Sequence, residues 1–229
     1  MKQYILAALA GLGLLLAISC TTPNPARRFP HMIADMEPFT IGTVEVFFDR
    51  LLSTTVHPAE AEVIFYPRLN AVALQFRHEF VTYRQFWDEV ARRQFISALE
   101  RYRADFGARN LRSNYRRTRA VYGSVNSRLE WETLRITRTR ISYPIIDLGY
   151  RFRGESPFFT TRTRTASEVG GPPTDSVENV QIHMYFTRAQ AGELASLFSQ
   201  AFLWGLIQNV RVPPPEERAV FDEYHEPDR

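Results

Sequence analysis

The sequence contains a single cysteine, Cys20, among its 229 residues. One cysteine cannot form a disulfide within the chain, so we expect no covalent cross-link to support the fold. The Cys/His spacings that are typical of structural zinc sites are missing as well. The folded part must therefore derive its stability from an apolar core, for which a hydrophobic content of 45% is sufficient.

Lysine is nearly absent too. Lys2 is the only lysine, so 27 of the 28 basic residues are arginines, in a chain of formal net charge +3. A GC-rich genome explains such a bias without reference to function. Alternatively, arginine is used because its planar guanidinium binds carboxylates and phosphates through two parallel hydrogen bonds. Composition alone leaves both explanations open.

Motifs of common catalytic and nucleotide-binding sites are also missing. The sequence has no Gly-x-Ser-x-Gly, no phosphate-binding loop and no dinucleotide-binding glycine pattern. Its histidines lie in separate segments without metal-ligand spacing, so we expect neither a metal nor a cofactor. These absences favour a non-catalytic protein. An enzyme whose site is assembled from distant residues stays open as the alternative.

Two of the histidines lie on predicted strands. His78 falls on an apolar strand face and is interpreted as a core residue. His183 shares the polar face of its strand with Tyr185 and can line a pocket. Carboxylate pairs at strand spacing, such as Glu130 and Glu132, are interpreted as salt-bridge partners for the arginines.

One long apolar run is present, and it is short for a membrane span. Ile5 to Ile18 follows Lys2 and ends at Ser19 and Cys20. A spanning helix needs about 20 apolar residues. A charged start, an apolar centre and small residues at the end are instead typical of a secretory signal. We therefore interpret residues 1–19 as a signal peptide.

The end of this run resembles the signal of bacterial lipoproteins. Ala17-Ile18-Ser19-Cys20 is similar to their lipobox, with Ala17 where leucine is usual, and such a relaxed box resembles that of spirochaete lipoproteins. The resemblance implies that Cys20 carries diacylglycerol and fatty acyl chains such as palmitate, becomes the new N-terminus and holds the protein at a membrane. An ordinary secreted protein or a short signal anchor is the alternative.

Three regions are expected to follow the signal peptide. Residues 20–38 contain four prolines among small and polar residues and are interpreted as a tether. Residues 39–211 are long enough for one α+β domain with its own core. Residues 212–229 are expected to form a proline-rich, acidic tail. Thr21 stands where an aspartate retains enteric lipoproteins in the inner membrane, so we expect a cell-envelope location at the outer membrane or its periplasmic face.

The domain is expected to begin with strands and to continue with a helix. Alternating apolar and polar residues predict strands at 43–49, 62–66 and 70–78. Thr82 and Gln85 then match a capping box, and the helix that they open is expected to run to about Phe106.

A second group of strands precedes a second helix. Strands are predicted at 117–122, 128–141, 145–153, 157–167 and 177–186. Thr187 and Gln190 repeat the capping box, and their helix is expected to reach Asn209 with apolar residues nearly all round, which is typical of a helix that is buried or faces a partner. The predicted fold class is α+β: an antiparallel sheet of about seven to eight strands with two long helices packed on one face.

Arginines concentrate in the second group of strands. Between Arg112 and Arg164 twelve arginines stand against four acidic residues. An arginine-bearing sheet face can bind anions such as lipid head groups, cell-wall polymers or an acidic protein, whereas nucleic acid is not expected in this compartment. The candidate ligand-binding residues are Arg138, Arg140, Arg151, Arg153, Arg162 and Arg164. The alternative is a solvated face neutralised by the acidic residues.

Together these observations predict a membrane-anchored envelope lipoprotein that acts as a non-catalytic binding or assembly module. An envelope hydrolase with an unrecognised site is one alternative, which a buried Asp/Glu/His/Ser cluster in a cleft would favour. A lipid-handling protein is another, which an internal void lined by aromatic residues would favour.

Overall fold

The computed structural model describes residues 32–49, 56–113, 120–133, 136–170 and 177–211. Contacts divide the chain into two units, Met1–Pro30 and His31–Arg229, and all described residues belong to the second. The predicted signal peptide, the proposed lipid-bearing Cys20 and the predicted tail lie outside the described residues.

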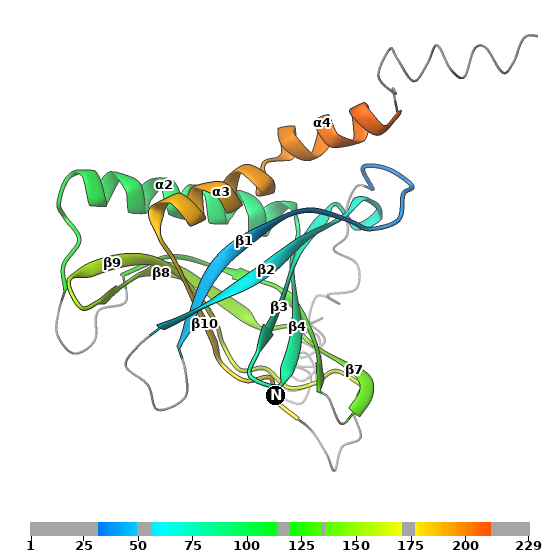
Figure 1. The fold of residues 1–229 in the computed structure, drawn as a ribbon, viewed down its shortest axis with the longest axis horizontal. Coiled ribbons are helices and arrows are strands. Elements are labelled where there is room, and N and C mark those ends of the chain that lie inside the picture. The colour runs from blue at the N-terminus through cyan, green and yellow to red at the C-terminus, as the bar shows by residue number, and fades with distance from the viewer. Residues whose placement is uncertain (1–31, 50–55, 114–119, 134–135, 171–176, 212–229) are drawn as a thin grey trace, which may run out of the picture. The chain divides into compact units, whose positions relative to one another are not determined.

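Ten strands form one sheet in the described part of the chain (Figure 1). Their order is β5-β8-β9-β10-β1-β2-β3-β4-β6-β7, and every pairing between neighbours is antiparallel. The strands are β1 (Phe39–Asp49), β2 (Val56–Tyr66), β3 (Ala71–His78), β4 (Val81–Trp87), β5 (Ala120–Asn126), β6 (Arg128–Thr133), β7 (Ile136–Ser142), β8 (Ile145–Arg153), β9 (Ser156–Thr163) and β10 (Ile182–Phe186). The helices are the short 3-10 helix η2 (Pro67–Leu69) and the α-helices α2 (Glu89–Gly107), α3 (Arg188–Phe198) and α4 (Gln200–Arg211).

Two chain segments, β5–β6 and β7–β8, form one bent hairpin whose two halves lie at opposite ends of this strand order. β5 continues into β6 through Ser127, and β7 continues into β8 through Tyr143 and Pro144. The β5–β8 half of the hairpin lies at one end of the order and the β6–β7 half at the other. The sheet must therefore curl until its ends meet at the bend. There the Ser127 amide donates to the Pro144 carbonyl (3.0 Å), and the Ser127 hydroxyl donates to the Phe86 carbonyl (2.8 Å).

The inner face of the curled sheet carries the core. Buried side chains alternate along the strands, as at Val44, Val46 and Phe48 of β1, and α2 and α3 lie over the same side of the sheet (Figure 1). Phe95 of α2 is at the centre, with its ring 5.1–6.4 Å from four other aromatic rings: Trp87, Phe159, Phe186 and Phe198. Each fully buried side chain of this size contributes about 1.5–3 kcal/mol.

The predicted fold is wrong in its strand number and in both helices. Thr82, where a helix was expected to start, lies within strand β4, which pairs with β3 on one side and β6 on the other. Gln85 does not return to cap a helix; its side-chain amide donates to the Thr163 hydroxyl across the buried interior (2.7 Å). Helix α2 starts only at Glu89, where the Asp88 carboxylate accepts from the Ala91 amide (2.8 Å).

Two further differences account for the remaining error. The segment predicted as one strand at 128–141 is two antiparallel strands, β6 and β7, and their pairing shifts register between Trp131 and Thr133. The second capping box is confirmed at Thr187 and Gln190. Its helix, however, breaks at Ser199 into α3 and α4, so two long helices are replaced by one of 19 residues and two of 11 and 12.

A buried arginine fixes the break between α3 and α4. Arg92 of α2 is 1% exposed and donates to the Phe198 carbonyl (2.9 Å), the Gln200 side chain (2.8 Å) and Asn70, through its carbonyl (3.1 Å) and its side-chain oxygen (2.7 Å). Burial lowers the pKa of Arg92 to about 10, so the guanidinium stays charged at neutral pH. Its hydrogen bond satisfies the Phe198 carbonyl, which has no partner within the helix because α3 ends there.

His78 extends the core to the end of β3. It follows Val72, Leu74 and Phe76 on the inner face, as the alternation predicts, and its ring stacks on Phe48 with centroids 5.0 Å apart. Burial lowers the pKa of His78 below its ordinary 6.5 because desolvation disfavours the imidazolium, and this effect exceeds the opposing effect of Glu79.

We predict that Arg92→Met destabilises the fold by about 2–4 kcal/mol, because the Phe198 and Asn70 carbonyls then remain buried without a donor. Chemical denaturation measures this loss. The matched control is Arg93→Met, which removes the neighbouring arginine of α2, 67% exposed in its side chain, and should change stability by less than about 0.5 kcal/mol. Equal effects of the two substitutions would contradict the role given to Arg92.

We also predict that stability falls on acidification through His78. The pKa of His78 is lower in the folded protein than the unfolded value of 6.5, so the unfolded chain binds the proton at a higher pH. Proton binding then favours the unfolded state, and the free energy of unfolding falls as the pH drops below about 6.5. Comparing the free energies of unfolding of the natural protein and His78→Phe at pH 7.5 and pH 5.5 tests this. From pH 7.5 to pH 5.5 the free energy of unfolding should fall less in the variant than in the natural protein. An equal fall in the two proteins would refute the assignment.

Candidate functional site

A row of charged side chains crosses the outer face of the sheet, the face away from α2 and α3. Asp147 of β8 lies opposite Arg162 of β9, and Arg162 lies opposite His183 of β10. Asp49 at the end of β1 extends the row, because its carboxylate lies 3.4 Å from Nδ1 of His183. Directly opposite residues on neighbouring strands share one face, so the strand register sets the order of these charges.

Tyr185 connects this row to two further arginines. Its hydroxyl accepts from Arg151 (3.1 Å) and Arg153 (2.6 Å) and donates to the Asp49 carboxylate (2.7 Å). Arg153 also forms an ion pair with Asp49, and its guanidinium lies 4.7 Å from the centre of the Tyr185 ring. Asp49 is therefore the carboxylate around which Arg151, Arg153 and Tyr185 are ordered.

Asp147 holds the other end of the row. Its carboxylate accepts two hydrogen bonds from Arg164 (2.7 and 3.0 Å) and one from the Ser124 hydroxyl (2.8 Å). This bidentate geometry is the strong form of the arginine–carboxylate pair. The pairing raises the pKa of Arg164, whose side chain is nonetheless half exposed.

Arg162 stands in the middle of the row. It lies between Asp147 and His183, and its Nε is buried without a hydrogen-bond partner in the described part of the chain. We call this group the Arg162 patch: Asp49, Asp147, Arg151, Arg153, Arg162, Arg164, His183 and Tyr185. Four arginines against two aspartates leave it a surplus of two positive charges, so it attracts anions.

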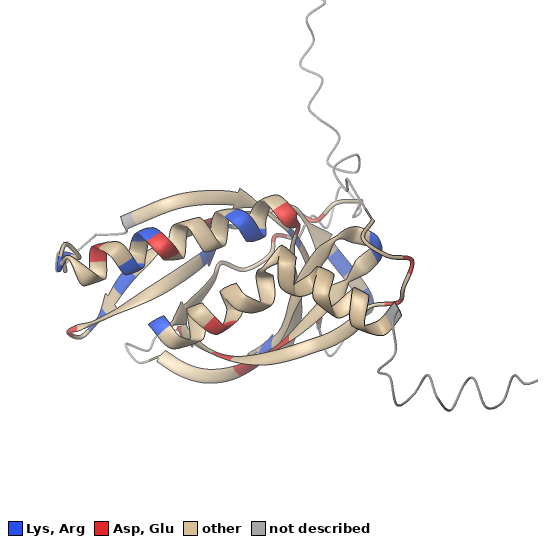
Figure 2. Ribbon diagram, turned by 90° about the horizontal axis from the view of Figure 1, so that it is seen from above, with Lys and Arg blue, Asp and Glu red and all other residues tan. Residues whose placement is uncertain are grey.

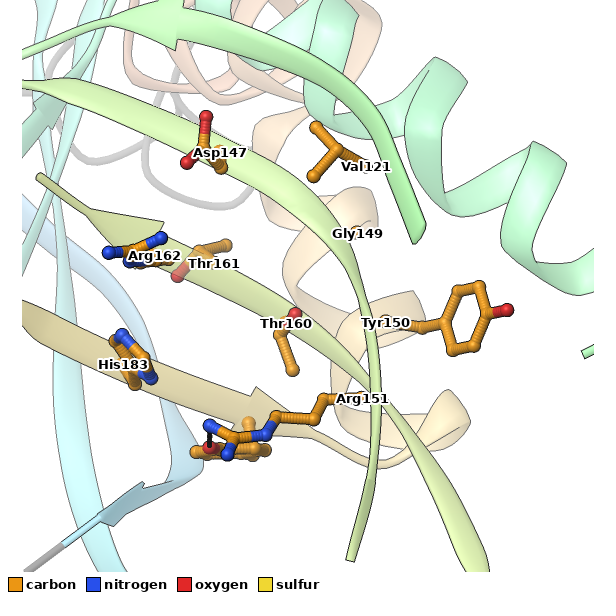
Figure 3. Close-up of a pocket in the computed structure, with 10 residues that line it drawn as sticks. Val121, Asp147, Gly149, Tyr150, Arg151, Thr160, Thr161, Arg162 and His183 are labelled. Carbon is orange, nitrogen blue, oxygen red and sulfur yellow. Dashed lines mark hydrogen bonds between the residues drawn. The ribbon is translucent and has the colours of Figure 1, made fainter. Parts of the chain in front are cut away.

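A small hollow lies beside Arg162 (Figure 3). It is lined by Arg151, Arg162, His183 and Tyr185 together with Gly149 and Thr160. Its volume of about 20 Å³ accepts one water molecule or one oxygen atom of an anion. A larger ligand must therefore bind at the surface of the patch.

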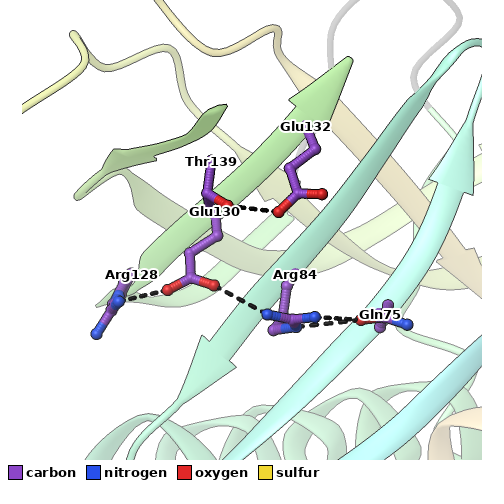
Figure 4. Close-up of polar contacts among 6 residues, drawn as sticks. All are labelled: Gln75, Arg84, Arg128, Glu130, Glu132 and Thr139. Carbon is purple, nitrogen blue, oxygen red and sulfur yellow. Dashed lines mark hydrogen bonds and ion pairs between the residues drawn. The ribbon is translucent and has the colours of Figure 1, made fainter. Parts of the chain in front are cut away.

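Elsewhere on the outer face the charges compensate one another. Gln75, Arg84 and Glu130 form a hydrogen-bonded ladder across β3, β4 and β6, and Glu130 also accepts from Arg128 (Figure 4). Figure 2 likewise shows both signs interspersed along α2. The positive surplus is thus a local property of the strands around Arg162.

The structure brings together four of the six arginines named as candidate ligand-binding residues. Arg151, Arg153, Arg162 and Arg164 belong to the Arg162 patch. Arg138 and Arg140 do not, since they lie on β7 at the other end of the strand order and pair with Glu168, whose side chain is 3% exposed. His183 and Tyr185 line the hollow, as their shared polar face predicted. Asp49 was not named as a ligand-binding residue; it pairs with Arg151 and Arg153, as the alternative of an arginine face neutralised by acidic residues expects.

The described residues contain no group of three or more His, Cys, Asp or Glu side chains that could hold a metal ion. No helix among them is long and apolar enough to cross a membrane. The Arg162 patch presents guanidinium, hydroxyl and imidazole groups together with the carboxylates of Asp49 and Asp147.

Comparisons with known proteins identify a family. A family model described as "Uncharacterised Treponema protein" matches residues 38–204. An uncharacterized protein of Treponema pallidum (strain Nichols) is 20% identical over 206 residues, which cover 90% of this chain and 70% of that protein. No solved structure matches the chain. Because the family model spans all ten strands, the α2 and α3 helices and the start of α4, the chain belongs to this Treponema protein family.

Proposed function

We propose that the protein is a lipid-anchored lipoprotein of the cell envelope that binds an anionic group through the Arg162 patch and catalyses no reaction. The observation that carries this proposal is the surplus of two positive charges in the Arg162 patch, where four arginines stand against Asp49 and Asp147. The ligand is a phosphate or carboxylate carried by a lipid head group, a cell-wall polymer or an acidic protein.

The anchor is proposed from the sequence alone. Cys20 follows a short apolar run and small residues, and acylation there would hold the domain beside a bilayer of the envelope. The location at the outer membrane or periplasmic face stays part of the proposal, as does the spirochaete-like form of the lipobox.

Two alternatives receive less support. A hydrolase needs a cleft for its substrate, whereas the hollow beside Arg162 accepts about one water and Asp49 is already bound by arginines. A lipid-handling protein needs a void between sheet and helices. Phe95 instead contacts Trp87, Phe159, Phe186 and Phe198 at the centre of that space.

We predict that Arg162→Gln weakens the binding of inorganic phosphate about tenfold, the effect of losing one charge-assisted hydrogen bond of roughly 1.5 kcal/mol. Titration followed by the NMR signals of the His183 ring measures the dissociation constant. Arg93→Gln is the control, because that arginine lies on α2, away from the outer face, and should leave binding unchanged. The proposal fails if both variants bind phosphate equally, or if the natural protein binds none.

For the anchor we predict that Cys20→Ala moves the mature protein from the membrane fraction to the soluble fraction, because the variant has no thiol to acylate. Mass spectrometry of the natural protein should find Cys20 at the N-terminus with acyl chains attached. Recovery of residues 1–19 on an unacylated chain, or equal membrane retention of the variant, would show that the anchor is wrong.

A further inference from the structure

Four polar side chains of β8 and β10 surround one carboxylate, that of Asp49. The Tyr185 hydroxyl donates to this carboxylate (2.7 Å), and Arg153 forms an ion pair with it. A guanidinium nitrogen of Arg151 lies 3.8 Å from it, and Nδ1 of His183 lies 3.4 Å from it. We call Arg151, Arg153, His183 and Tyr185 the carboxylate cage. The cage belongs to β8 and β10, whereas the carboxylate inside it comes from the last residue of β1.

The cage is ordered by contacts that do not involve Asp49. Tyr185 is 0% exposed, and its hydroxyl also accepts from Arg151 and Arg153; the bond from Arg151 is the dashed line in Figure 3. The Arg153 guanidinium lies over the Tyr185 ring, and the Phe158 ring packs against the same tyrosine with centroids 6.2 Å apart. β9 pairs with β8 on one side and with β10 on the other. The cage is therefore preorganised for an anion, which favours binding.

Asp49 reaches the cage through its side chain. The pairing of β1 with β10 ends at Phe48 and Met184, one residue before Asp49. On its other side Asp49 pairs with Val56 of β2. A change of rotamer is thus enough to withdraw the carboxylate, because the strand itself stays paired with β2. The Asp49 side chain is 27% exposed, so it has a path to solvent.

The charges of the cage require an anion inside it. Arg151 and Arg153 place two guanidinium groups around the buried hydroxyl of Tyr185, and without a carboxylate these like charges repel each other. Asp49 supplies the carboxylate from within the chain. A carboxylate of another molecule offers the same two oxygens to the same donors. Asp49 is therefore an internal competitor of such a ligand.

The group that fills the cage indicates the kind of ligand that fits it. It is an aspartate side chain at the end of a β-strand. Aromatic rings lie beside the cage, since Phe47 packs against Phe158 with centroids 6.0 Å apart and Phe158 packs against Tyr185. Arginine and aromatic residues are enriched at the centres of protein interfaces. This combination fits an acidic side chain of a protein better than the phosphate of a lipid.

We propose that the carboxylate cage recognises an aspartate or glutamate side chain of an acidic partner protein, and that Asp49 closes the cage until that side chain displaces it. The inference rests on the proposed function, because it names the ligand group and the regulation of the Arg162 patch. Only molecules whose cage is open bind the partner. The apparent dissociation constant is therefore the intrinsic one divided by the open fraction.

Asp49→Asn tests the competition. The amide keeps the shape of the side chain and an oxygen that accepts from Tyr185, but it loses the charge that pairs with Arg153. We expect N-acetylaspartate amide, a single acidic side chain on a blocked backbone, to bind this variant at least tenfold more tightly than the natural protein. Titration followed by the NMR signals of the His183 ring measures both dissociation constants. Combining Asp49→Asn with Arg153→Gln should abolish the gain.

Asp147→Asn is the charge-matched control. It removes the same charge from the same patch, but the Asp147 carboxylate is bound by Arg164 and not by the cage. The control should therefore tighten the binding of N-acetylaspartate amide less than threefold. Equal gains in the two single variants would reflect net charge alone and would overturn the inference.

The displacement itself is measured in the natural protein. The carboxyl ¹³C signal of Asp49, identified by its loss in Asp49→Asn, should shift when N-acetylaspartate amide binds. Binding that leaves this signal unchanged shows that Asp49 is not displaced. Glucuronate, the carboxylate of an acidic sugar, should bind Asp49→Asn more weakly than N-acetylaspartate amide does. Equal or tighter binding of glucuronate contradicts a protein partner and favours a cell-wall polymer.

Phosphate titrations of the same proteins separate this inference from the proposed function. If the natural protein binds phosphate and Asp49→Asn shows no gain for N-acetylaspartate amide, the cage is wrong and the anion-binding patch is right. If neither the natural protein nor the variants bind either anion, the proposed function is wrong and the inference fails with it. Phosphate binding by the natural protein together with the gain in Asp49→Asn supports both.

Discussion

The covalent continuity of the bent hairpin constrains the rest of the structure. The chain runs directly from β5 into β6 and from β7 into β8. Because β5 and β8 lie at one end of the ten-stranded order and β6 and β7 at the other, these two segments connect the two ends of the sheet. The sheet cannot stay open, so it curls and acquires an inner and an outer face. Gln85 and Thr163, from strands far apart in the order, meet inside it through a buried hydrogen bond. The inner face carries the core around Phe95 and is covered by α2 and α3, and the outer face carries the rows of charges together with aromatic residues such as Tyr185.

This division of faces explains why the polar groups are arranged as they are. The charges of the outer face are held in rows by the strand register, and along β3, β4 and β6 they neutralise each other. Around Arg162 they do not, which makes that patch the strongest candidate for anion recognition. Helix α4 is a separate element, because α3 ends with its C-cap at Ser199 and α4 begins at Gln200.

The candidate site was predictable where its residues are neighbours in one hairpin. Arg151 and Arg153 on β8 and Arg162 and Arg164 at the end of β9 recur at a spacing of two, and adjacent antiparallel strands bring such residues together. Arg138 and Arg140 have the same spacing on β7, but the bend at Tyr143 and Pro144 sends that strand to the other end of the order. Asp49 joins the site through the pairing of β1 with β10, a contact between segments that no local pattern relates.

By itself the sequence determined the features that depend on near neighbours: the alternation that places Val72, Leu74, Phe76 and His78 on one face, and the capping box at Thr187 and Gln190. The tertiary structure decided the features for which one local pattern permits two outcomes. Thr82 and Gln85 fit a helix start, yet strand pairing on both sides and a hydrogen bond to Thr163 make their segment β4. The apolar run after Thr187 fits one long helix, yet Arg92, 106 residues before the carbonyl of Phe198, ends α3 there. In both cases a buried hydrogen bond between distant residues outweighs helix propensities of less than about 1 kcal/mol per residue.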